Sequence, residues 1–184
     1  MKKFLQNPAQ KKNPDQKVDG IPRNLLRQNF MKKAIAESLI GFRKGHGGPF
    51  GAIIVQDGKI IASGHNQVLS TLDPTAHAEV VVIREACLKL GRFQLEGCEL
   101  YTSCEPCPMC LSAAYWAKVD KIYFGNTRRD AAAIGFGDDL IYSEFTLPRG
   151  KRKIKMVRLL GKEALAGFKE WKSSNLKIHY GPEV

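Results

Sequence analysis

Apolar residues recur at helical spacing near the start of the patterned part of the chain. Between Asn24 and Phe42 they fall three or four positions apart, which predicts one amphipathic helix. Residues 1–22 are polar, contain three prolines and show no period, so we expect a flexible, basic N-terminal arm there. The Gly-rich stretch GHGGPFG (45–51) ends the predicted helix.

Two short apolar runs rich in β-branched residues come next and predict a β-hairpin. They are FGAIIV (50–55) and KIIASG (59–64), and Asp57-Gly58 lies between them. An Asp-Gly pair between such runs is typical of a two-residue hairpin turn.

Helical and strand patterns then alternate toward the C-terminus. Helices are predicted at 76–90, 107–117 and 162–173, and strands at 98–103, 121–126 and 153–160. This alternation predicts an α/β fold, with a partly parallel central sheet covered by helices on its faces. We expect residues 23–184 to form one domain.

The composition narrows the class of protein. The chain has 184 residues, of which 43% are apolar and 26% charged, as is typical of a soluble globular protein. It contains no apolar run near the ~18 residues of a membrane span. No apolar stretch follows the basic N-terminus, so a secretory signal is not expected either. We therefore expect a cytoplasmic protein without a membrane partner.

The net charge of +11 is concentrated at the two ends of the chain. Residues 1–33 and 148–184 each carry +7, whereas residues 34–147 carry −3. Basic segments favour nucleic acid, but they also serve as solvated tails. The charge pattern leaves both interpretations open, although it places little positive charge near the chemical motifs described next.

Two segments that stand 30 residues apart carry metal-binding side chains. Cys107 and Cys110 stand at the start of a predicted helix, where the helix dipole stabilises thiolates. His77 stands at the start of the preceding predicted helix. Because parallel strand–helix units place their helix starts at one end of a sheet, we expect these three side chains to meet. They suit Zn²⁺, and three protein ligands leave a fourth position for water, as in catalytic sites.

Glu79 follows His77 by two positions and is the expected general acid–base. A carboxylate beside a zinc-activated water can take a proton and deliver it to a leaving group. The combination of His-x-Glu with Pro-Cys-x-x-Cys, here at 77–79 and 106–110, is the known signature of zinc-dependent base deaminases.

Other uses of the cysteines and histidines have to be weighed. Cys104 extends the motif to C-x-x-C-x-x-C, which resembles part of an iron–sulfur run, but a well-placed fourth cysteine is missing. We interpret Cys104 as a small buried residue at a strand end. A structural zinc or RNA-binding module would need a fourth ligand, for which Cys104 is the obvious candidate. The remaining histidines are interpreted as loop or surface residues: His46, His65 and His179.

Longer stretches of the sequence resemble the cytidine deaminase superfamily, and within it the small bacterial guanine deaminases. The similar stretches are GGPFGAIIV (47–55), DPTAHAEV (73–80), VIREAC (82–87), YTSCEPCPMCL (101–111), YWA (115–117) and GFGDDLIY (135–142). The resemblance implies a cytidine deaminase-like three-layer α/β/α fold with a five-stranded mixed central sheet. It also implies a homodimer, one Zn²⁺ per subunit, and hydrolysis of the C2 amino group of guanine to give xanthine and ammonia.

The same resemblance implies roles for single residues. Phe50 would stack on the purine, Asn66 would hydrogen-bond a base edge, and Trp116 would lie near the pocket. The backbone N–H of Ala78 would bind the base carbonyl. Glu79 would move the proton between water and a ring nitrogen.

The C-terminal part is implied to complete the active site. Asp138 would shuttle a proton to the leaving ammonia, although Asp139 is an alternative because Gly137 separates this pair from the Gly-Phe dipeptide. The segment 161–184 would close over an active site, by exchange between subunits in the homodimer, and Tyr180 would lie in that segment.

Two related activities stay open at this point. A tRNA-specific adenosine deaminase would share the zinc ligands and fit the net charge, but it would place basic residues around the pocket. A guanosine deaminase would share GGPFGA and DPTAHAEV.

Overall fold

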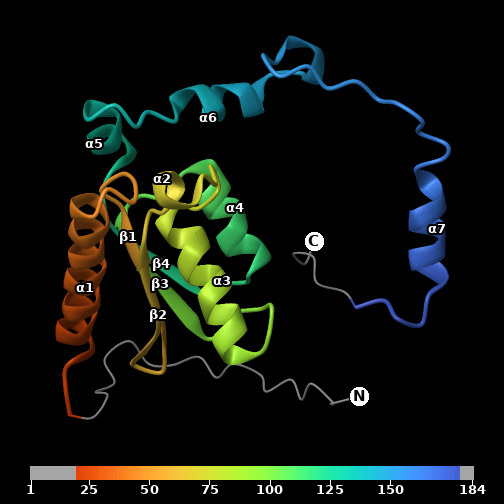
Figure 1. Cartoon of the computed structure of the whole chain (residues 1–184). Coiled ribbons are helices and arrows are strands. Elements are labelled where there is room, and N and C mark those ends of the chain that lie inside the picture. Colours follow the sequence, from red (N-terminus) through yellow and green to blue (C-terminus); the bar gives the residue numbers. More distant parts are fainter. Residues whose placement is uncertain (1–19, 179–184) are drawn as a thin grey trace. The chain divides into compact units, whose positions relative to one another are not determined.

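The computed structural model describes residues 20–178 (Figure 1). The expected N-terminal arm, apart from its last three residues, lies outside this described part. The chain divides into two units, Met1–Gly137 and Asp138–Val184, which are described separately. No helix in the described residues is long and apolar enough to cross a membrane.

The first unit is built around one sheet. Its strands, in the spatial order β2-β1-β3-β4, are β2 (Lys59–His65), β1 (Gly51–Gln56), β3 (Cys98–Cys104) and β4 (Lys121–Asn126). Strand β1 pairs antiparallel with β2 and with β3, whereas β3 and β4 are parallel. The sheet is therefore mixed, as expected, but it has four strands in the described part of the chain and not five.

The hairpin between β1 and β2 follows from its turn residues. Gln56 pairs with Lys59, and the two residues between them, Asp57 and Gly58, have φ angles of 50° and 78°. A two-residue turn with positive φ at both positions matches the twist of the strands, and Asp-Gly tolerates it well.

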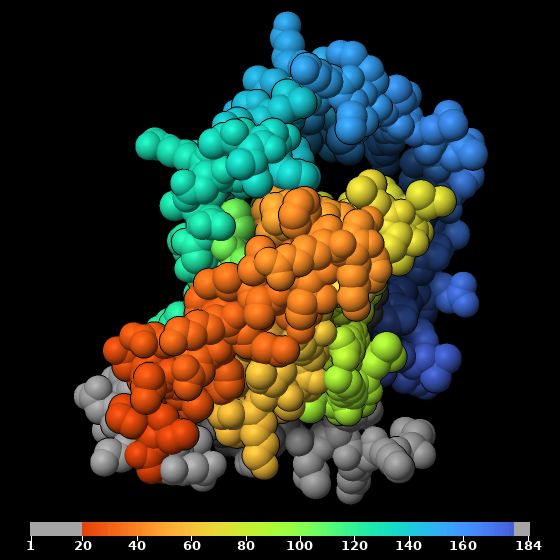
Figure 2. Space-filling view, turned by 60° about the vertical axis from the view of Figure 1, so that its left-hand side comes forward, coloured from red at the N-terminus to blue at the C-terminus, as the bar shows by residue number. Residues whose placement is uncertain are grey.

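Helices cover both faces of the sheet, which gives the expected three layers (Figure 1). Helix α1 (Arg23–Arg43) packs on one face, where Phe30 and Ala34 form a core with Ile53, Val55 and Tyr101. Figure 2 shows α1, in red and orange, lying across this face.

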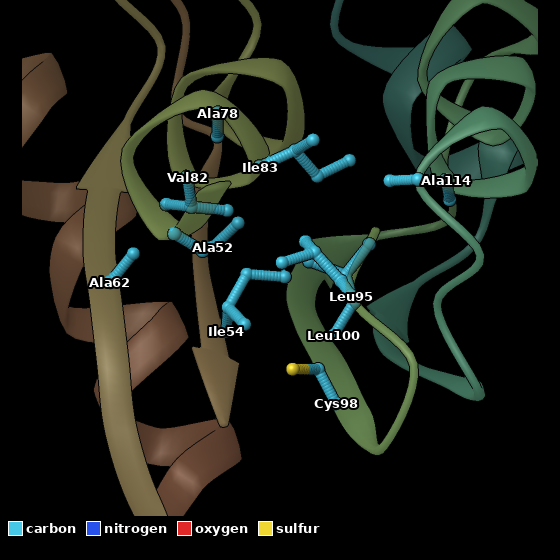
Figure 3. Packing of buried hydrophobic residues seen from close by; sticks show 12 residues of the cluster. Ala52, Ile54, Ala62, Ala78, Val82, Ile83, Leu95, Cys98, Leu100 and Ala114 are labelled. Atoms are coloured by element: carbon cyan, nitrogen blue, oxygen red, sulfur yellow. The ribbon is translucent and has the colours of Figure 1, made fainter. Parts of the chain in front are cut away.

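Helices α3 (Ala78–Leu90) and α4 (Pro108–Trp116) pack on the other face of the sheet. Figure 3 shows the larger core between them and the strands, in which the buried residues include Ala52, Ile54, Ala62, Val82, Ile83, Leu95, Leu100 and Ala114. Strand β1 thus sends alternate side chains into two cores. This explains why its sequence is a continuous apolar run.

The other elements are short. Helix α2 (Val68–Thr71) lies in the connection between β2 and α3. Helix α5 (Arg128–Ala133) begins with a capping box formed by Thr127 and Asp130. The second unit contains α6 (Asp139–Thr146), the 3₁₀ turn η1 (Arg149–Lys151) and α7 (Leu165–Ser173).

The predicted fifth strand at 153–160 is wrong. These residues form bends and irregular backbone, and their side chains are exposed. The apolar residues suggested a strand, but a strand needs a hydrogen-bonding partner, and this segment pairs with no strand in the described part of the chain. The helix predicted at 162–173 is present, although it begins at Leu165.

Candidate active site

The sheet topology brings two helix starts to one place. Because β2 and β3 are each antiparallel to β1, they run in the same direction. The helices that follow them, α3 and α4, therefore start at the same edge of the sheet. His77 is the N-cap residue of α3, and Cys107 is the N-cap residue of α4.

The three residues with metal-binding side chains meet at this edge. His77 Nδ1 lies 3.6 Å from Cys107 Sγ and 3.5 Å from Cys110 Sγ. All three ligand atoms lie within 4.8 Å of one another, and no other group of His, Cys, Asp and Glu side chains in residues 20–178 is arranged in this way. One imidazole and two thiolates form a donor set that zinc prefers.

The electrostatics of the cluster favour a thiolate at Cys107. A hydrogen bond from Cys110, together with His77 nearby, lowers the pKa of Cys107 to about 4 despite partial burial. The same hydrogen bond and deeper burial raise the pKa of Cys110, which therefore holds the proton between the two sulfurs. The interaction with Cys107 also raises the pKa of His77. A cation that replaces this proton would stabilise both sulfurs as thiolates.

Glu79 lies against the cluster in the first turn of α3. Its side chain is buried, and the residue is only 5% exposed. One carboxylate oxygen accepts a hydrogen bond from Thr102 Oγ1 at 3.1 Å, and the other accepts one from Cys110 Sγ at 3.4 Å. Burial raises the pKa of Glu79 above its ordinary value. A raised pKa makes this carboxylate a stronger base than an exposed glutamate, and a carboxyl group can return the proton that it accepts.

Thr102 was not predicted as a functional residue. It is fully buried on β3, and its hydroxyl is directed to Glu79. The alternation of side chains along a strand places Thr102 on the same face as Leu100, which packs under α3 and α4. That alternation was the available signal, but the sequence did not show which helical residue lies opposite.

Phe50 and Asn66, the two predicted base contacts, are neighbours in the fold. The Asn66 N–H donates to the Phe50 carbonyl at 2.9 Å, and Asn66 Oδ1 accepts from the Val68 N–H at 3.1 Å. Asn66 is 5% exposed. The Phe50 and Phe136 rings form a T-shaped pair, with ring centroids 5.0 Å apart and an interplanar angle of 88°.

The other predicted contacts differ in their placement. Ala78 is fully buried between His77 and Glu79 at the first helical position of α3, where backbone N–H groups have no acceptor within the helix. Trp116 is the last residue of α4, roughly 12 Å along the axis from the helix start, and is 54% exposed. Asp138 and Asp139 belong to the second unit. Tyr180 lies outside the described residues.

Cys104 does not join the metal-binding cluster. It is the last residue of β3, it is buried, and its Sγ contacts the Thr127 carbonyl at 3.6 Å. Burial raises the pKa of this thiol to about 11. The interpretation of Cys104 as a small buried residue at a strand end is therefore confirmed, and the cluster has three ligand residues.

The α/β fold has three layers, and its α3 and α4 starts carry a His-Cys-Cys cluster with a buried glutamate beside it. Together these features define a zinc-dependent deaminase. Residues 26–126 match the cytidine and deoxycytidylate deaminase zinc-binding region, so the chain belongs to that family. The expectations of an enzyme of this family, with zinc as its cofactor, are confirmed.

Individual relatives show which members of this family the chain is similar to. The chain is 47% identical over 153 residues to the guanine deaminase of Bacillus subtilis (strain 168), covering 83% of this chain and 98% of the relative. The X-ray structure of guanine deaminase from Bacillus subtilis superposes with a TM-score of 0.81 over the same shares of the two chains. A tRNA-specific adenosine deaminase from Aquifex aeolicus is also 47% identical, but over 98 residues, which cover 53% of this chain and 64% of that one.

Proposed function

We propose that this protein is a guanine deaminase, which hydrolyses guanine to xanthine and ammonia in purine metabolism. The observation that carries the chemistry is the buried Glu79 carboxyl group, which contacts both Cys110 of the metal-binding cluster and Thr102. The choice of guanine is supported by the similarity to the Bacillus subtilis guanine deaminase, which spans 98% of that enzyme.

His77, Cys107 and Cys110 fit the zinc ion that the family requires. Their three ligand atoms face one another, two of them are sulfurs, and Cys107 already favours the thiolate. Zinc, when bound, supplies Lewis acidity that makes water a nucleophile at neutral pH. These three residues are the proposed ligands, and the cofactor is one Zn²⁺ per subunit.

Glu79 is the proposed proton carrier. Its carboxylate takes a proton from the attacking water and delivers it to a ring nitrogen of the purine, which makes C2 more electrophilic. Burial raises its pKa, and a higher pKa makes the carboxylate a stronger base toward the attacking water. Asp138, with Asp139 as the alternative, is proposed to pass a proton to the departing ammonia.

The purine is proposed to lie between Phe50 and Asn66. The flat base would stack on the Phe50 ring, and the Asn66 amide would bind one polar edge. The backbone N–H of Ala78, at the positive end of α3, would donate to the C6 carbonyl. Trp116 and Tyr180 are proposed to line the outer part of the pocket, where their aromatic rings would exclude water.

The second unit is proposed to close an active site in a homodimer. Its segment 161–184 would cover the pocket, through an exchange between two subunits. Support comes from large apolar side chains that are exposed on its helices, including Leu140, Phe145, Phe168 and Trp171. In a partnered subunit these side chains would be buried. The domain is proposed to comprise residues 23–184.

The cytoplasm is the proposed location. All five cysteines are free, as is usual in a reducing compartment.

Three alternative functions can be distinguished from guanine deamination. A tRNA-specific adenosine deaminase would explain the basic ends, but the Aquifex aeolicus relative matches only 53% of this chain. A structural zinc or RNA-binding module would leave the buried Glu79 carboxyl group without a role. Guanosine deamination differs from the proposed reaction only in the ribose that the pocket must admit.

The deciding experiment is ammonia release by the purified, zinc-loaded full chain. Guanine, guanosine, adenine, cytidine and an anticodon-stem RNA are tested side by side, with Glu79→Gln as the matched inactive control. We expect release from guanine and none from the RNA. Release from the RNA alone would overturn the substrate, and release from none of the five would overturn the enzyme assignment.

A further inference from the structure

A second cluster of ionisable side chains lies outside the metal-binding site. It joins Glu37 on α1, His65 at the end of β2 and His46 in the loop after α1. His46 Nδ1 lies 2.9 Å from His65 Nε2, and His65 Nδ1 lies 3.4 Å from Glu37 Oε2. The side chains of Glu37 and His65 are only 13% and 12% exposed.

The chemistry of the three side chains indicates which group donates and which accepts in each hydrogen bond of the cluster. A carboxylate can only accept, so His65 donates to Glu37 from Nδ1, and in the neutral imidazole its Nε2 is then an acceptor. The Nδ1–H of His46 then donates to that nitrogen. The chain of bonds runs from His46 through His65 to Glu37, and it fixes the tautomers of both rings.

Glu37 is held as an anion that can anchor the chain. Burial raises the pKa of Glu37, but hydrogen bonds from Ser63 and His65, together with Lys33, outweigh burial and hold the pKa below its ordinary value. Ser63 Oγ lies 2.7 Å from the carboxylate, and Lys33 Nζ lies 3.4 Å from it.

The two imidazoles are held by packing as well. His65 lies against Gly41 of α1, where an added Cβ would come within 2.5 Å of the ring. The centroids of the two imidazole rings are 5.1 Å apart. Glu37 bonds His65 on the nitrogen that faces away from His46, so the three residues do not converge on one ion. Their geometry is that of a hydrogen-bonded relay and not of a metal site.

Both histidines stand next to the proposed purine-binding residues. His65 directly precedes Asn66, whose N–H is bonded to the Phe50 carbonyl. The carbonyl of His46 accepts the N–H groups of Leu69 and Ser70, at 3.0 and 3.1 Å. The cluster therefore connects the loop before Phe50 with the turn that begins at Asn66. Figure 2 shows these two surface segments side by side, in orange and yellow.

We propose that Glu37, His65 and His46 form a positioning relay, which holds Phe50 and Asn66 in the geometry that binds the purine. This inference rests on the proposed guanine deamination. None of the three residues is expected to touch the reacting atoms. Their loss should therefore weaken substrate binding and leave the chemical step largely intact.

The test compares four variants of the zinc-loaded full chain on guanine. His46→Ala and Glu37→Gln each disrupt one bond of the relay. His65→Gln retains one donor and one acceptor. Glu85→Gln is the matched control, since it removes a charge from an exposed ion pair with Lys89 on α3. For each variant KM, kcat, zinc content and melting temperature are measured.

His46→Ala and Glu37→Gln are expected to raise KM roughly 3- to 10-fold, the usual effect of losing one buried hydrogen bond, with kcat within about twofold of wild type. His65→Gln should keep most of the wild-type affinity for guanine, because it retains one donor and one acceptor. Glu85→Gln should have the same KM and kcat as wild type. If the wild type deaminates guanine and His46→Ala leaves KM for guanine unchanged, the relay is overturned and the proposed function is not. Loss of zinc or a fall in kcat at unchanged KM would also overturn it. A wild type without activity on guanine would overturn the proposed function, and the positioning role with it.

A substrate-free measurement tests the relay separately. In the proton NMR spectrum, the Nδ1–H protons of His46 and His65 are expected to exchange slowly and to lie downfield in the wild type. The His65 signal should move or disappear in Glu37→Gln, whereas Glu85→Gln should leave it in place. Rapid exchange of both protons in the wild type would contradict the relay whatever the substrate.

Discussion

The Thr102 hydroxyl donates to the Glu79 carboxyl group across 3.1 Å, and both side chains are buried between the sheet and α3. This bond connects the proposed proton carrier to β3, a strand that has a neighbouring strand on each side. A residue on a strand therefore helps to orient the side chain that the first turn of α3 carries.

Replacing Glu79 with Gln tests its proposed role directly. The amide keeps the shape of the side chain but cannot carry a proton, so kcat is expected to fall by roughly 10²- to 10⁴-fold. Zinc content should stay near one per subunit, because Glu79 is not a proposed ligand. Ammonia release and metal analysis on the same sample provide the measurement. Turnover close to wild type would remove Glu79 from the mechanism.

Replacing Thr102 with Val should alter the same carboxyl group more gently. Burial raises the pKa of Glu79, and the Thr102 hydrogen bond partly counters this rise because it favours the charged form. Thr102→Val should therefore raise the pKa of Glu79 further and move the acid limb of the kcat/KM profile to higher pH. At neutral pH we expect a loss of roughly tenfold in kcat. An unmoved acid limb would show that Thr102 does not act through Glu79.

Removing Cys107 should remove the metal and the activity together. Cys107→Ala leaves two of three ligands, and the zinc content of the purified protein should fall well below one per subunit. Treating the wild type with a chelator should give the same loss, reversed by added Zn²⁺. Cys87→Ala, a half-buried thiol outside the cluster, is the control and should keep its zinc. Stoichiometric zinc in Cys107→Ala would exclude this residue from the ligand set.

Gly47 should be needed for the placement of Asn66. A Cβ added at Gly47 would overlap Asn66 Oδ1, and that residue is too buried to move freely. Gly47→Ala is expected to raise KM for guanine roughly tenfold, by displacing the Asn66 side chain. Gly150→Ala, where the added Cβ meets no atom within 4 Å, is the control. Equal KM values in the two variants would count against Asn66 as a base contact.

The stability of the fold should depend on pH through Glu37. Its folded pKa lies below the ordinary value of 4.5, so the unfolded chain binds this proton more readily. The contribution of Glu37 is fully present above about pH 4.5 and is lost as the pH falls through the lower folded pKa. Between pH 7 and pH 3.5, urea unfolding should show a smaller loss of stability in Glu37→Gln than in wild type. Parallel losses in the two proteins would contradict the lowered pKa.

Local signals explain what the sequence predicted well. The Asp57-Gly58 turn, the strand at β1 and the helix starts at His77 and Cys107 each depend on residues close in sequence. To predict that the three metal-binding side chains meet, one further rule was needed. Parallel strand–helix units place their helix starts at the same edge of a sheet. That rule holds here even though β1 lies between β2 and β3.

The features that the sequence did not predict depend on distant partners. The segment 153–160 carries apolar residues suited to a strand, but its pairing depends on an available sheet edge. Thr102 and Glu79 stand 23 residues apart, and His46 and His65 stand 19 apart. Nothing in the sequence near His46 or His65 distinguishes them from surface histidines. Only the packing of α1 against β2 shows that they form a connected pair.

The residues at the starts of α3 and α4 affect the stability of the metal-free protein. His77 and Cys107 occupy N-cap positions, and neither side chain makes a capping hydrogen bond. Ser, Thr, Asp or Asn at such a position contributes typically about 1 kcal/mol to stability. The starts of α3 and α4 therefore lack the stabilisation that a capping side chain gives. Zinc binding by His77 and Cys107 would stabilise the fold at the same positions. Zinc would then contribute to the stability of the folded chain as well as to its chemistry.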